Sequence, residues 1–409
     1  MSALLHVNDL KKHFLVRSGP LGLGATWVYA VDGVSFHVDR GEALALVGES
    51  GCGKSTVGRA ILGLFDITAG QVVLDGQRID DLSPNALRPL RRRMQAVFQD
   101  PFSSLNPRMR VHDILAEPIR NFGLASTRAD MNARIDALMD KVRLPRDAVK
   151  RWPHEFSGGQ RQRIAIARAL AAEPALVVCD EAVSALDVSV KAQIVNLLHD
   201  LQQELGLALL FISHDLAIVE HIAQRVAVMY LGKIVEVAPK RDIFAAPRHP
   251  YTRALLSAVP IPEPGAAHHR IVLKGDVPSA INPPKGCHFH TRCPHVFDRC
   301  RIEEPELRLT EDAHFAACHL NELPAADDHS GPEAPTRPAP APLTRETSTE
   351  NSVGLGQTLG PKLVQSNRVS ASVWRCRNSK VVFERPSVFE TSYRPCENRG
   401  ASPTIPQSA

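Results

Sequence analysis

The stretch Gly48-Glu49-Ser50-Gly51-Cys52-Gly53-Lys54-Ser55-Thr56 decides the fold of this chain. It matches G-x-x-x-x-G-K-[ST], in which glycines let backbone N–H groups converge on phosphate oxygens that a Cβ would obstruct. The apolar run 43–47 before it predicts a buried strand. Residues from Lys54 to about Leu64 predict a helix, whose N-terminus adds partial positive charge. The sequence therefore predicts a phosphate-binding loop, with Lys54 directed at the β- and γ-phosphates and Ser55 ligating Mg²⁺.

Three further apolar strands end in residues suited to metal and water chemistry. The run LVVCD at 176–180 ends in Asp180, which would hold Mg²⁺, and Glu181 follows it as a candidate general base. In FISHD at 211–215, His214 would contact the γ-phosphate and hold Glu181 and the attacking water in place. Gln99, in VFQDP at 97–101, would contact both Mg²⁺ and water. Taken alone, His214 and Gln99 are equally explained as hydrogen-bonding partners of neighbouring groups, but the phosphate loop upstream favours a catalytic role.

The segment FSGGQRQR at 156–163 lies between the phosphate loop and the acidic strand. A Ser hydroxyl and Gly N–H groups at a helix N-terminus form a second anion-binding element. The chain therefore carries two such elements.

Composition is that of an ordinary soluble protein, with 44% hydrophobic and 22% charged residues. A net charge of +4 over 409 residues is too small to indicate a nucleic-acid partner. The N-terminus lacks the apolar region of a signal peptide, and no apolar run reaches the roughly 18–20 residues that cross a bilayer. We expect a cytosolic chain that reaches a membrane only by docking, and one whose eight cysteines form no disulfide framework.

Strands that alternate with helices predict an α/β layer with a mainly parallel sheet. Near residue 325 the composition changes to Pro, Ala, Ser and Thr, which cannot bury enough apolar area to fold, so residues 326–409 are expected to be a disordered tail. The other predicted elements are strands at 34–38, 72–76 and 207–213, a helix at 190–205 and helical segments within 112–150.

With these motifs placed, the chain resembles the ATP-binding subunits of ABC transporters from about residue 4 to 325. Walker A is 48–56, the Q-loop centres on Gln99, the signature is FSGGQ, Walker B is 176–181, the D-loop is 184–187 and the switch histidine is His214. The resemblance implies a P-loop NTPase fold with a RecA-like parallel-sheet core, an antiparallel β subdomain and a helical signature subdomain at about 100–160. It also implies an ABC ATPase domain at 1–240 and a small Cys-containing C-terminal domain at 241–325.

The same resemblance assigns the signature to a second subunit's nucleotide. It implies that Ser157, Gly158 and Gly159, with the adjoining Gln160, cap the γ-phosphate of ATP held by the opposite Walker A loop. It further implies an aromatic residue under the adenine. Phe14 in LKKHF is the best match, given an insertion around 19–26, while Trp27 and Tyr29 remain competing candidates.

Four segments, at 97–108, 180–194, 229–236 and 249–260, resemble the dipeptide/oligopeptide importer branch. That branch implies two transmembrane permease subunits, a second ATPase in a homo- or heterodimer, and an extracytoplasmic binding protein, with the chain peripheral on the cytoplasmic face of the inner membrane. Nickel, glutathione, opine and oligosaccharide systems use similar subunits. A soluble ABC ATPase of DNA repair or translation is another alternative, and so is a non-catalytic regulatory subunit, which Glu181 and His214 disfavour.

Four cysteines cluster late in the sequence, at Cys287, Cys293, Cys300 and Cys318. Their spacing is not the C-x₂-C pattern of common zinc sites, although four thiolates suit either zinc or a [4Fe–4S] cluster. Similar segments of related importer ATPases are associated with an iron–sulfur cluster, so the resemblance implies one here, with zinc and no metal as the alternatives. The nearby histidines 288, 290 and 295 are interpreted as surface residues.

Overall fold

The computed structural model describes residues 3–18, 24–259 and 270–322, and its main feature is an eight-stranded sheet. The strand order is β11-β12-β10-β9-β3-β8-β7-β6. The strands from β9 to β6 in this order run parallel, which confirms the predicted parallel-sheet core. They are β3 (Ala43–Val47), β6 (Met94–Phe98), β7 (Leu176–Asp180), β8 (Ala208–Ser213) and β9 (Arg225–Tyr230).

Strand β3 shows why apolar runs form the centre of this sheet. All five of its residues are buried, and successive side chains point to opposite faces. Ala43, Ala45 and Val47 belong to the core shared with the helices that follow β6, whereas Leu44 and Leu46 belong to the core shared with helix α1 (Lys54–Ile61) and the N-terminal strands. Because both faces are covered, the strand has no polar alternation.

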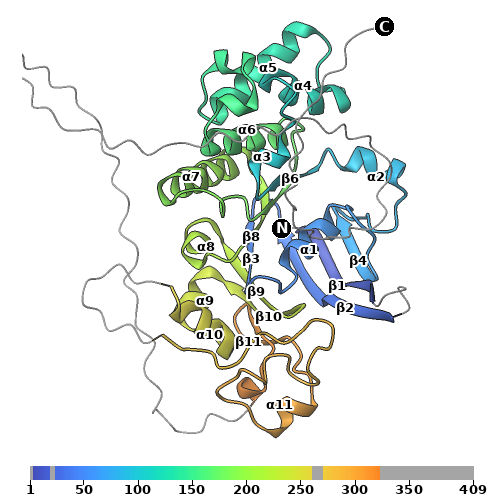
Figure 1. Ribbon diagram of the computed structural model, residues 1–409, viewed down its shortest axis with the longest axis vertical. Helices are drawn as coiled ribbons and strands as arrows, with labels where there is room; N and C mark the ends of the chain where they lie inside the picture. Colours follow the sequence, from blue (N-terminus) through green and yellow to red (C-terminus); the bar gives the residue numbers. More distant parts are fainter. Residues whose placement is uncertain (1–2, 19–23, 260–269, 323–409) are drawn as a thin grey trace, which may run out of the picture. The chain divides into compact units, whose positions relative to one another are not determined.

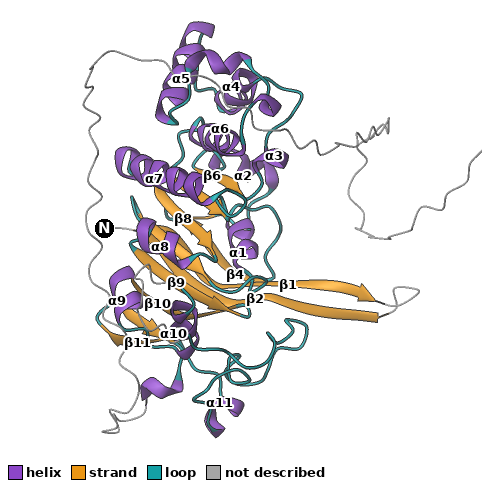
Figure 2. Ribbon diagram, turned by 60° about the vertical axis from the view of Figure 1, so that its left-hand side comes forward, coloured by secondary structure: helices purple, strands orange, loops and turns teal. Residues whose placement is uncertain are grey.

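A second, four-stranded sheet is antiparallel, with the order β2-β1-β4-β5, as the predicted antiparallel β subdomain requires. Its members are β1 (Ala3–Ser18), β2 (Gly24–Asp39), β4 (Ala69–Leu74) and β5 (Gln77–Arg78). Figure 2 shows β1 and β2 extending as a long hairpin beyond the other strands. The predicted strand at 34–38 is the end of β2, and the predicted strand at 72–76 is β4 followed by a tight turn.

Between β6 and β7 the chain is helical, as predicted. Thr127 and Ser157 cap two of these helices by accepting hydrogen bonds from the backbone N–H groups of Asp130 and Gln160, respectively. Figure 1 shows this helical segment (green) beyond the β6 end of the main sheet. Its elements, preceded by α2 (Pro84–Leu90), are α3 (Pro101–Ser104), α4 (Val111–Asn121), α5 (Arg128–Lys141), the 3₁₀ turns Arg146–Lys150 and Pro153–Glu155, and α6 (Gly158–Leu170).

The C-terminal region is attached to the main sheet itself. Strand β12 (His314–Ala316) pairs antiparallel with β10 (Lys233–Pro239), and β11 (Arg308–Glu311) pairs with β12. The domain boundaries 1–240 and 241–325 remain predictions, and the expected tail at 326–409 lies outside the described residues. The remaining helices are α7 (Val188–Leu205), α8 (Leu216–Ile222), α9 (Lys240–Ala245), α10 (Pro250–Ser257) and α11 (Asp298–Ile302), followed by the 3₁₀ turn His319–Glu322.

The structure corrects the predicted end of one helix. Helix α1 ends at Ile61 rather than near Leu64, because Gly63 adopts a left-handed conformation with φ of 60° and ends the turn. Among the described residues, no helix combines the length and apolarity that crossing a membrane requires.

Candidate active site

The phosphate loop 48–53 makes a tight turn between β3 and α1. Gly48 and Gly53 have φ values of 153° and 105°. A Cβ on Gly48 would lie 2.1 Å from the carbonyl oxygen of Met229, and one on Gly53 would lie 2.1 Å from that of Ala30. Backbone atoms cannot swing aside, so only glycine fits at either position.

Lys54 lies inside this loop, with 4% of its surface exposed. Its ammonium group donates to the carbonyl oxygens of Gly48 at 2.8 Å and Glu49 at 2.9 Å, and lies 3.7 Å from the Cys52 sulfur. Burial raises the pKa of the Cys52 thiol. The loop therefore holds a positive charge beside its converging N–H groups, as an anion site requires. The other loop positions are Ser50, which is exposed, and Thr56, half-buried in the first turn of α1.

Ser55 and Asp180, the two residues predicted to hold magnesium from the phosphate loop and β7, lie in contact. The Ser55 hydroxyl donates to Asp180 Oδ1 at 2.6 Å, joining α1 to the end of β7. Arg59 Nε lies 3.7 Å from the other carboxylate oxygen. A hydroxyl and a carboxylate at this distance are hard oxygen ligands of the kind that Mg²⁺ prefers, so these residues fit a magnesium ion.

Glu181 and His214 also come together. His214 Nδ1 lies 3.3 Å from Glu181 Oε1. Glu181 has φ of 49°, its N–H donates to the carbonyl of Ile212, and its carbonyl accepts from the N–H and the hydroxyl of Ser184. A non-glycine residue in the left-handed region is strained, and these contacts hold it there. The main chain of Glu181 is thus held just past the end of β7, one residue beyond Asp180.

Gln99 lies at the same edge of the sheet. It directly follows Phe98, which pairs with Asp180 across the β6–β7 ladder, and it is exposed. Parallel strands bring their carboxyl ends to one edge, so Gln99, Asp180 and His214 share the side on which α1 begins. The predicted set of catalytic and magnesium residues is therefore assembled in one place.

The signature segment forms the N-terminus of α6. The Ser157 hydroxyl accepts from Gln160 N–H, and the Gln160 side-chain oxygen accepts from Ser157 N–H, so the two residues make a capping box. Gly159 packs against Val190 of α7, since a Cβ there would lie 2.4 Å from Val190 Cγ1. Ser157 is exposed, and within the described residues no hydrogen bond joins this segment to the phosphate loop.

The adenine contact remains a prediction. Phe14, on β1, packs its ring against Phe65 with centroids 5.7 Å apart, and the Lys12 ammonium lies 4.9 Å from its centroid. Of the competitors, Tyr29 packs on His13, and Trp27 is 48% exposed on the hairpin. These contacts do not distinguish the three aromatic residues.

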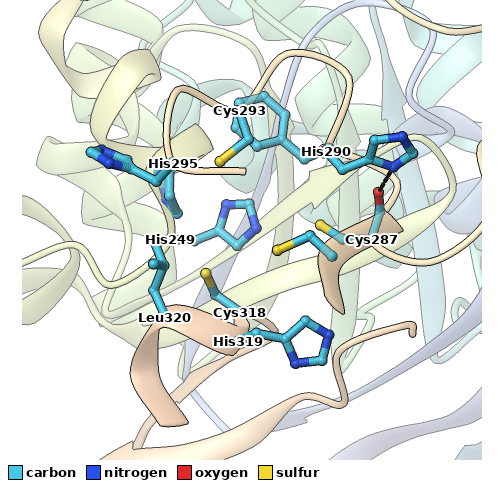
Figure 3. A pocket seen from close by; sticks show the side chains of 11 residues that line it. His249, Cys287, His290, Cys293, His295, Cys318, His319 and Leu320 are labelled. Atoms are coloured by element: carbon cyan, nitrogen blue, oxygen red, sulfur yellow. Dashed lines mark hydrogen bonds between the residues drawn. The ribbon is translucent and has the colours of Figure 1, made fainter. Parts of the chain in front are cut away.

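The four clustered cysteines line one pocket, together with His249, Phe289 and others. Figure 3 shows the sulfur atoms of Cys287, Cys293 and Cys318 turned toward its middle. In the part of the chain that the structure describes, no three His, Cys, Asp or Glu side chains are placed to hold a metal ion. The surface prediction is wrong for His288, which is buried with Nδ1 3.0 Å from the Leu231 carbonyl oxygen.

Sequence reasoning missed how the C-terminal region reaches the phosphate loop. The Glu49 N–H donates to the hydroxyl of Tyr251, and the Glu49 carboxylate pairs with Arg292. One signal was present, because a carboxylate inside an anion-binding loop needs a positive partner. The sequence could not say which of 48 Lys and Arg residues supplies it.

Two family descriptions match the chain. The first, ABC transporter, covers residues 31–184, and the second, the C-terminal region of oligopeptide/dipeptide transporters, covers residues 235–300. A protein of Sinorhizobium fredii named as a peptide ABC transporter ATP-binding protein is 54% identical over 332 residues, 81% of this chain and 94% of the relative. The oligopeptide transport ATP-binding protein AppF of Bacillus subtilis is 50% identical over 320 residues, 78% of this chain and 97% of AppF.

Solved structures with the same fold agree with these sequence matches. CbiO1 from Clostridium perfringens, part of an ABC transporter complex, superimposes with a TM-score of 0.52 and 27% identity, covering 60% of this chain and 92% of its own. The cassette MJ0796, solved as a dimer with ADP and phosphate, has the same TM-score and identity and covers 58% of this chain and 99% of its own.

Proposed function

The chain belongs to the ABC transporter family, as one of its ATP-binding proteins, and from this premise we propose that it is the ATPase subunit of a peptide importer. The single observation that carries the ATPase assignment is the contact of the Ser55 hydroxyl with Asp180 next to the phosphate loop, and the contact of Glu181 with His214 supports it. Relatives that are 50–54% identical and are named for peptide or oligopeptide transport support the cargo.

Hydrolysis follows from the placement of these side chains. The loop N–H groups and Lys54 would bind the phosphates, and Glu181 would accept a proton from the attacking water while His214 holds its carboxylate. Mg²⁺, held by Ser55 and Asp180 with Gln99 nearby, would neutralise charge that develops on the phosphates. The left-handed backbone of Glu181 sets the direction in which its side chain leaves the chain, and the contact with His214 holds the carboxylate, which together favour a general base.

We propose that the complete site needs a second ATPase subunit. Ser157 is exposed at a helix N-terminus, where a phosphate of another subunit can approach, and a similar cassette was solved as a dimer. The partner is either a copy of this chain or a related ATPase. Two membrane permeases and an extracytoplasmic binding protein complete the proposed importer, and the chain is proposed to dock on the cytoplasmic face of the inner membrane.

The cargo assignment has an alternative within the same class. Nickel, glutathione and other small solutes use similar ATPase subunits, and the site residues named above are proposed to bind the nucleotide and not the cargo. Uptake of labelled dipeptides is measured in cells that lack the gene for this chain, with and without the chain supplied again. Uptake that depends on the chain supports the peptide cargo over the other solutes. Restoration of nickel uptake alone would reassign the cargo.

We further propose that the four clustered cysteines bind a metal group, with [4Fe–4S] preferred over zinc. Four thiols that line one pocket supply the number and type of donors that either group needs, although no three of the described side chains are placed to hold a metal ion. Burial raises the pKa of Cys287 to about 11 and that of Cys318 to about 12, so a bound cation would be needed to favour the thiolates. Anaerobically purified protein should then absorb near ~400 nm and contain iron, whereas zinc-loaded protein would be colourless.

Substitution of the general base tests the proposed hydrolysis. The Glu181→Gln variant should bind ATP but lose at least ~100-fold in turnover, because the amide cannot accept the proton. Glu306→Gln, at a carboxylate that is 75% exposed on the C-terminal region, is the matched control and should hydrolyse ATP at the parental rate. Unchanged hydrolysis in Glu181→Gln would remove this residue as the base.

A further inference from the structure

A salt bridge joins the C-terminal region to the phosphate loop. Arg292 Nη1 lies 2.7 Å from Glu49 Oε2, and Nη2 lies 3.1 Å from Oε1, so the pair is bidentate. The Arg292 side chain is 8% exposed and that of Glu49 28%. A bidentate Arg–carboxylate pair that is mostly shielded from water fixes the orientation of both side chains.

The main chain of Glu49 is held as firmly as its side chain. Its N–H donates to Tyr251 Oη at 2.8 Å, and its carbonyl accepts from Lys54 Nζ at 2.9 Å. The same carbonyl also accepts from the Cys52 N–H at 3.3 Å. Every polar group of Glu49 therefore has a partner, and two of its four partners, Tyr251 and Arg292, come from beyond residue 240. Lys54, which would contact the phosphates, is therefore hydrogen-bonded to the residue that the C-terminal region holds.

The residues that hold Glu49 are themselves rigidly packed. Tyr251 is fully buried, with its ring 4.7 Å from Tyr230 and 5.4 Å from Phe289, centroid to centroid. The Arg292 guanidinium lies 5.9 Å from the Tyr230 ring centroid. This aromatic group leaves Tyr251 and Arg292 little freedom, so the C-terminal region helps to hold Glu49 in place.

Electrostatics gives this contact a consequence for nucleotide binding. A carboxylate within the phosphate loop carries the same sign as the phosphates, and like charges at close range oppose binding. Arg292 neutralises that carboxylate and turns it toward the C-terminal region. Without Arg292, Glu49 would keep its charge and be free to turn toward the phosphates or to compete for Lys54.

We propose that Arg292 is a positioning residue for ATP binding, which acts by neutralising and orienting Glu49, with Tyr251 holding the Glu49 main chain. The proposal rests on the proposed ATPase function and adds to it that the C-terminal region sets the affinity of the phosphate loop. Because Arg292 acts through Glu49 and not on the catalytic residues, its substitution should raise Kd and KM for ATP and leave kcat at saturating ATP within about twofold.

Titration of the full chain with a fluorescent ATP analogue tests the proposal. Arg292→Ala should weaken binding about tenfold, and Arg292→Lys, which keeps the charge but loses the fork, about threefold. Tyr251→Phe, which keeps the ring packing and removes only the hydroxyl, should weaken binding about threefold as the Glu49 N–H loses its acceptor. Arg299→Ala is the matched control, because Arg299 pairs with Glu303 and Glu322 in the same region without touching the loop.

A double variant separates positioning from general destabilisation. In Arg292→Ala, adding Glu49→Gln removes the unpaired charge, so the double variant should bind the analogue more tightly than Arg292→Ala alone. Parental affinity in both Arg292 variants would overturn the proposal, and so would a double variant weaker than Arg292→Ala. Should Arg292→Ala fail to fold, Arg292→Lys and Tyr251→Phe still decide the outcome. Parental protein that binds no nucleotide would instead refute the proposed function.

Discussion

Replacing Gly159 of the signature by alanine tests how α6 packs on α7. The added Cβ would lie 2.4 Å from Val190 Cγ1, well inside the contact distance of real carbon atoms. A valine within a helix has one strongly preferred rotamer, so Val190 cannot rotate away cheaply. Overpacking of this kind costs about 1–3 kcal/mol, and the better helix propensity of alanine returns at most about 1 kcal/mol.

We therefore expect Gly159→Ala to lower the free energy of unfolding by about 1–2 kcal/mol, measured by urea denaturation of the full chain. Val190→Ala removes the clashing methyl groups. The Gly159→Ala/Val190→Ala double variant should therefore have about the same free energy of unfolding as Val190→Ala alone. Gly158→Ala is the matched control, since its Cβ would meet Leu186 Cδ2 at an ordinary 3.6 Å.

The Gly159→Ala, Val190→Ala and double variants also show whether Gly159→Ala acts through helix packing or through a contact with the nucleotide. The Gly159 Cβ points toward α7 and not toward the exposed Ser157, so ATP hydrolysis should recover together with stability in the double variant. The reasoning would be refuted by a Gly159→Ala variant as stable as the parent, or by losses in Gly159→Ala and Val190→Ala that simply add.

Three further predictions follow from buried contacts and from the extent of the family match. Glu236 is fully buried and accepts from His314, so Glu236→Gln should cost about 3 kcal/mol in urea denaturation. Burial opposes the charge of Glu236, but its hydrogen bonds outweigh burial and lower its pKa. The stabilisation by the charged Glu236 is therefore present above pH 4.5 and should be lost as the pH falls further. A Glu236→Gln variant whose free energy of unfolding depends on pH as the parent's does would contradict this. Ser55→Ala should raise the Mg²⁺ concentration for half-maximal hydrolysis about tenfold, with a smaller rise arguing that Asp180 alone holds the ion. Removing residues 326–409 should leave Tm and hydrolysis unchanged, because both family descriptions end by residue 300 and every predicted nucleotide-site residue lies before residue 215.

The sequence predicted the elements that local patterns determine. Strand β3 and the helix N-terminus at Ser157 were readable because each rests on neighbouring residues. The end of α1 was misplaced by three residues, since only the backbone of Gly63 reveals the left-handed turn. The periodicity of hydrophobic residues gives little information about such backbone conformations.

Contacts between distant segments were beyond sequence reasoning. Arg292 and Glu49 are 243 positions apart, and no local pattern pairs them. The cysteines could be grouped by their spacing, but their common pocket depends on how β12, α11 and the loop at 287–293 fold together. The meeting of Glu181 with His214 could be foreseen, because each residue lies at the carboxyl end of an apolar strand and parallel strands bring those ends to one edge of the sheet.

The pairing of β12 with β10 has a consequence for how the chain is made. Strand β10 ends at residue 239, yet the strand that covers its outer edge begins at residue 314. During synthesis, at roughly 5–20 residues per second, that edge stays open for several seconds after β10 emerges. An open edge offers unpaired N–H and C=O groups to other chains, so aggregation of nascent protein is the expected hazard. Ribosome-bound chains halted before residue 314 should therefore depend on chaperones, and chains halted well after residue 322 should not.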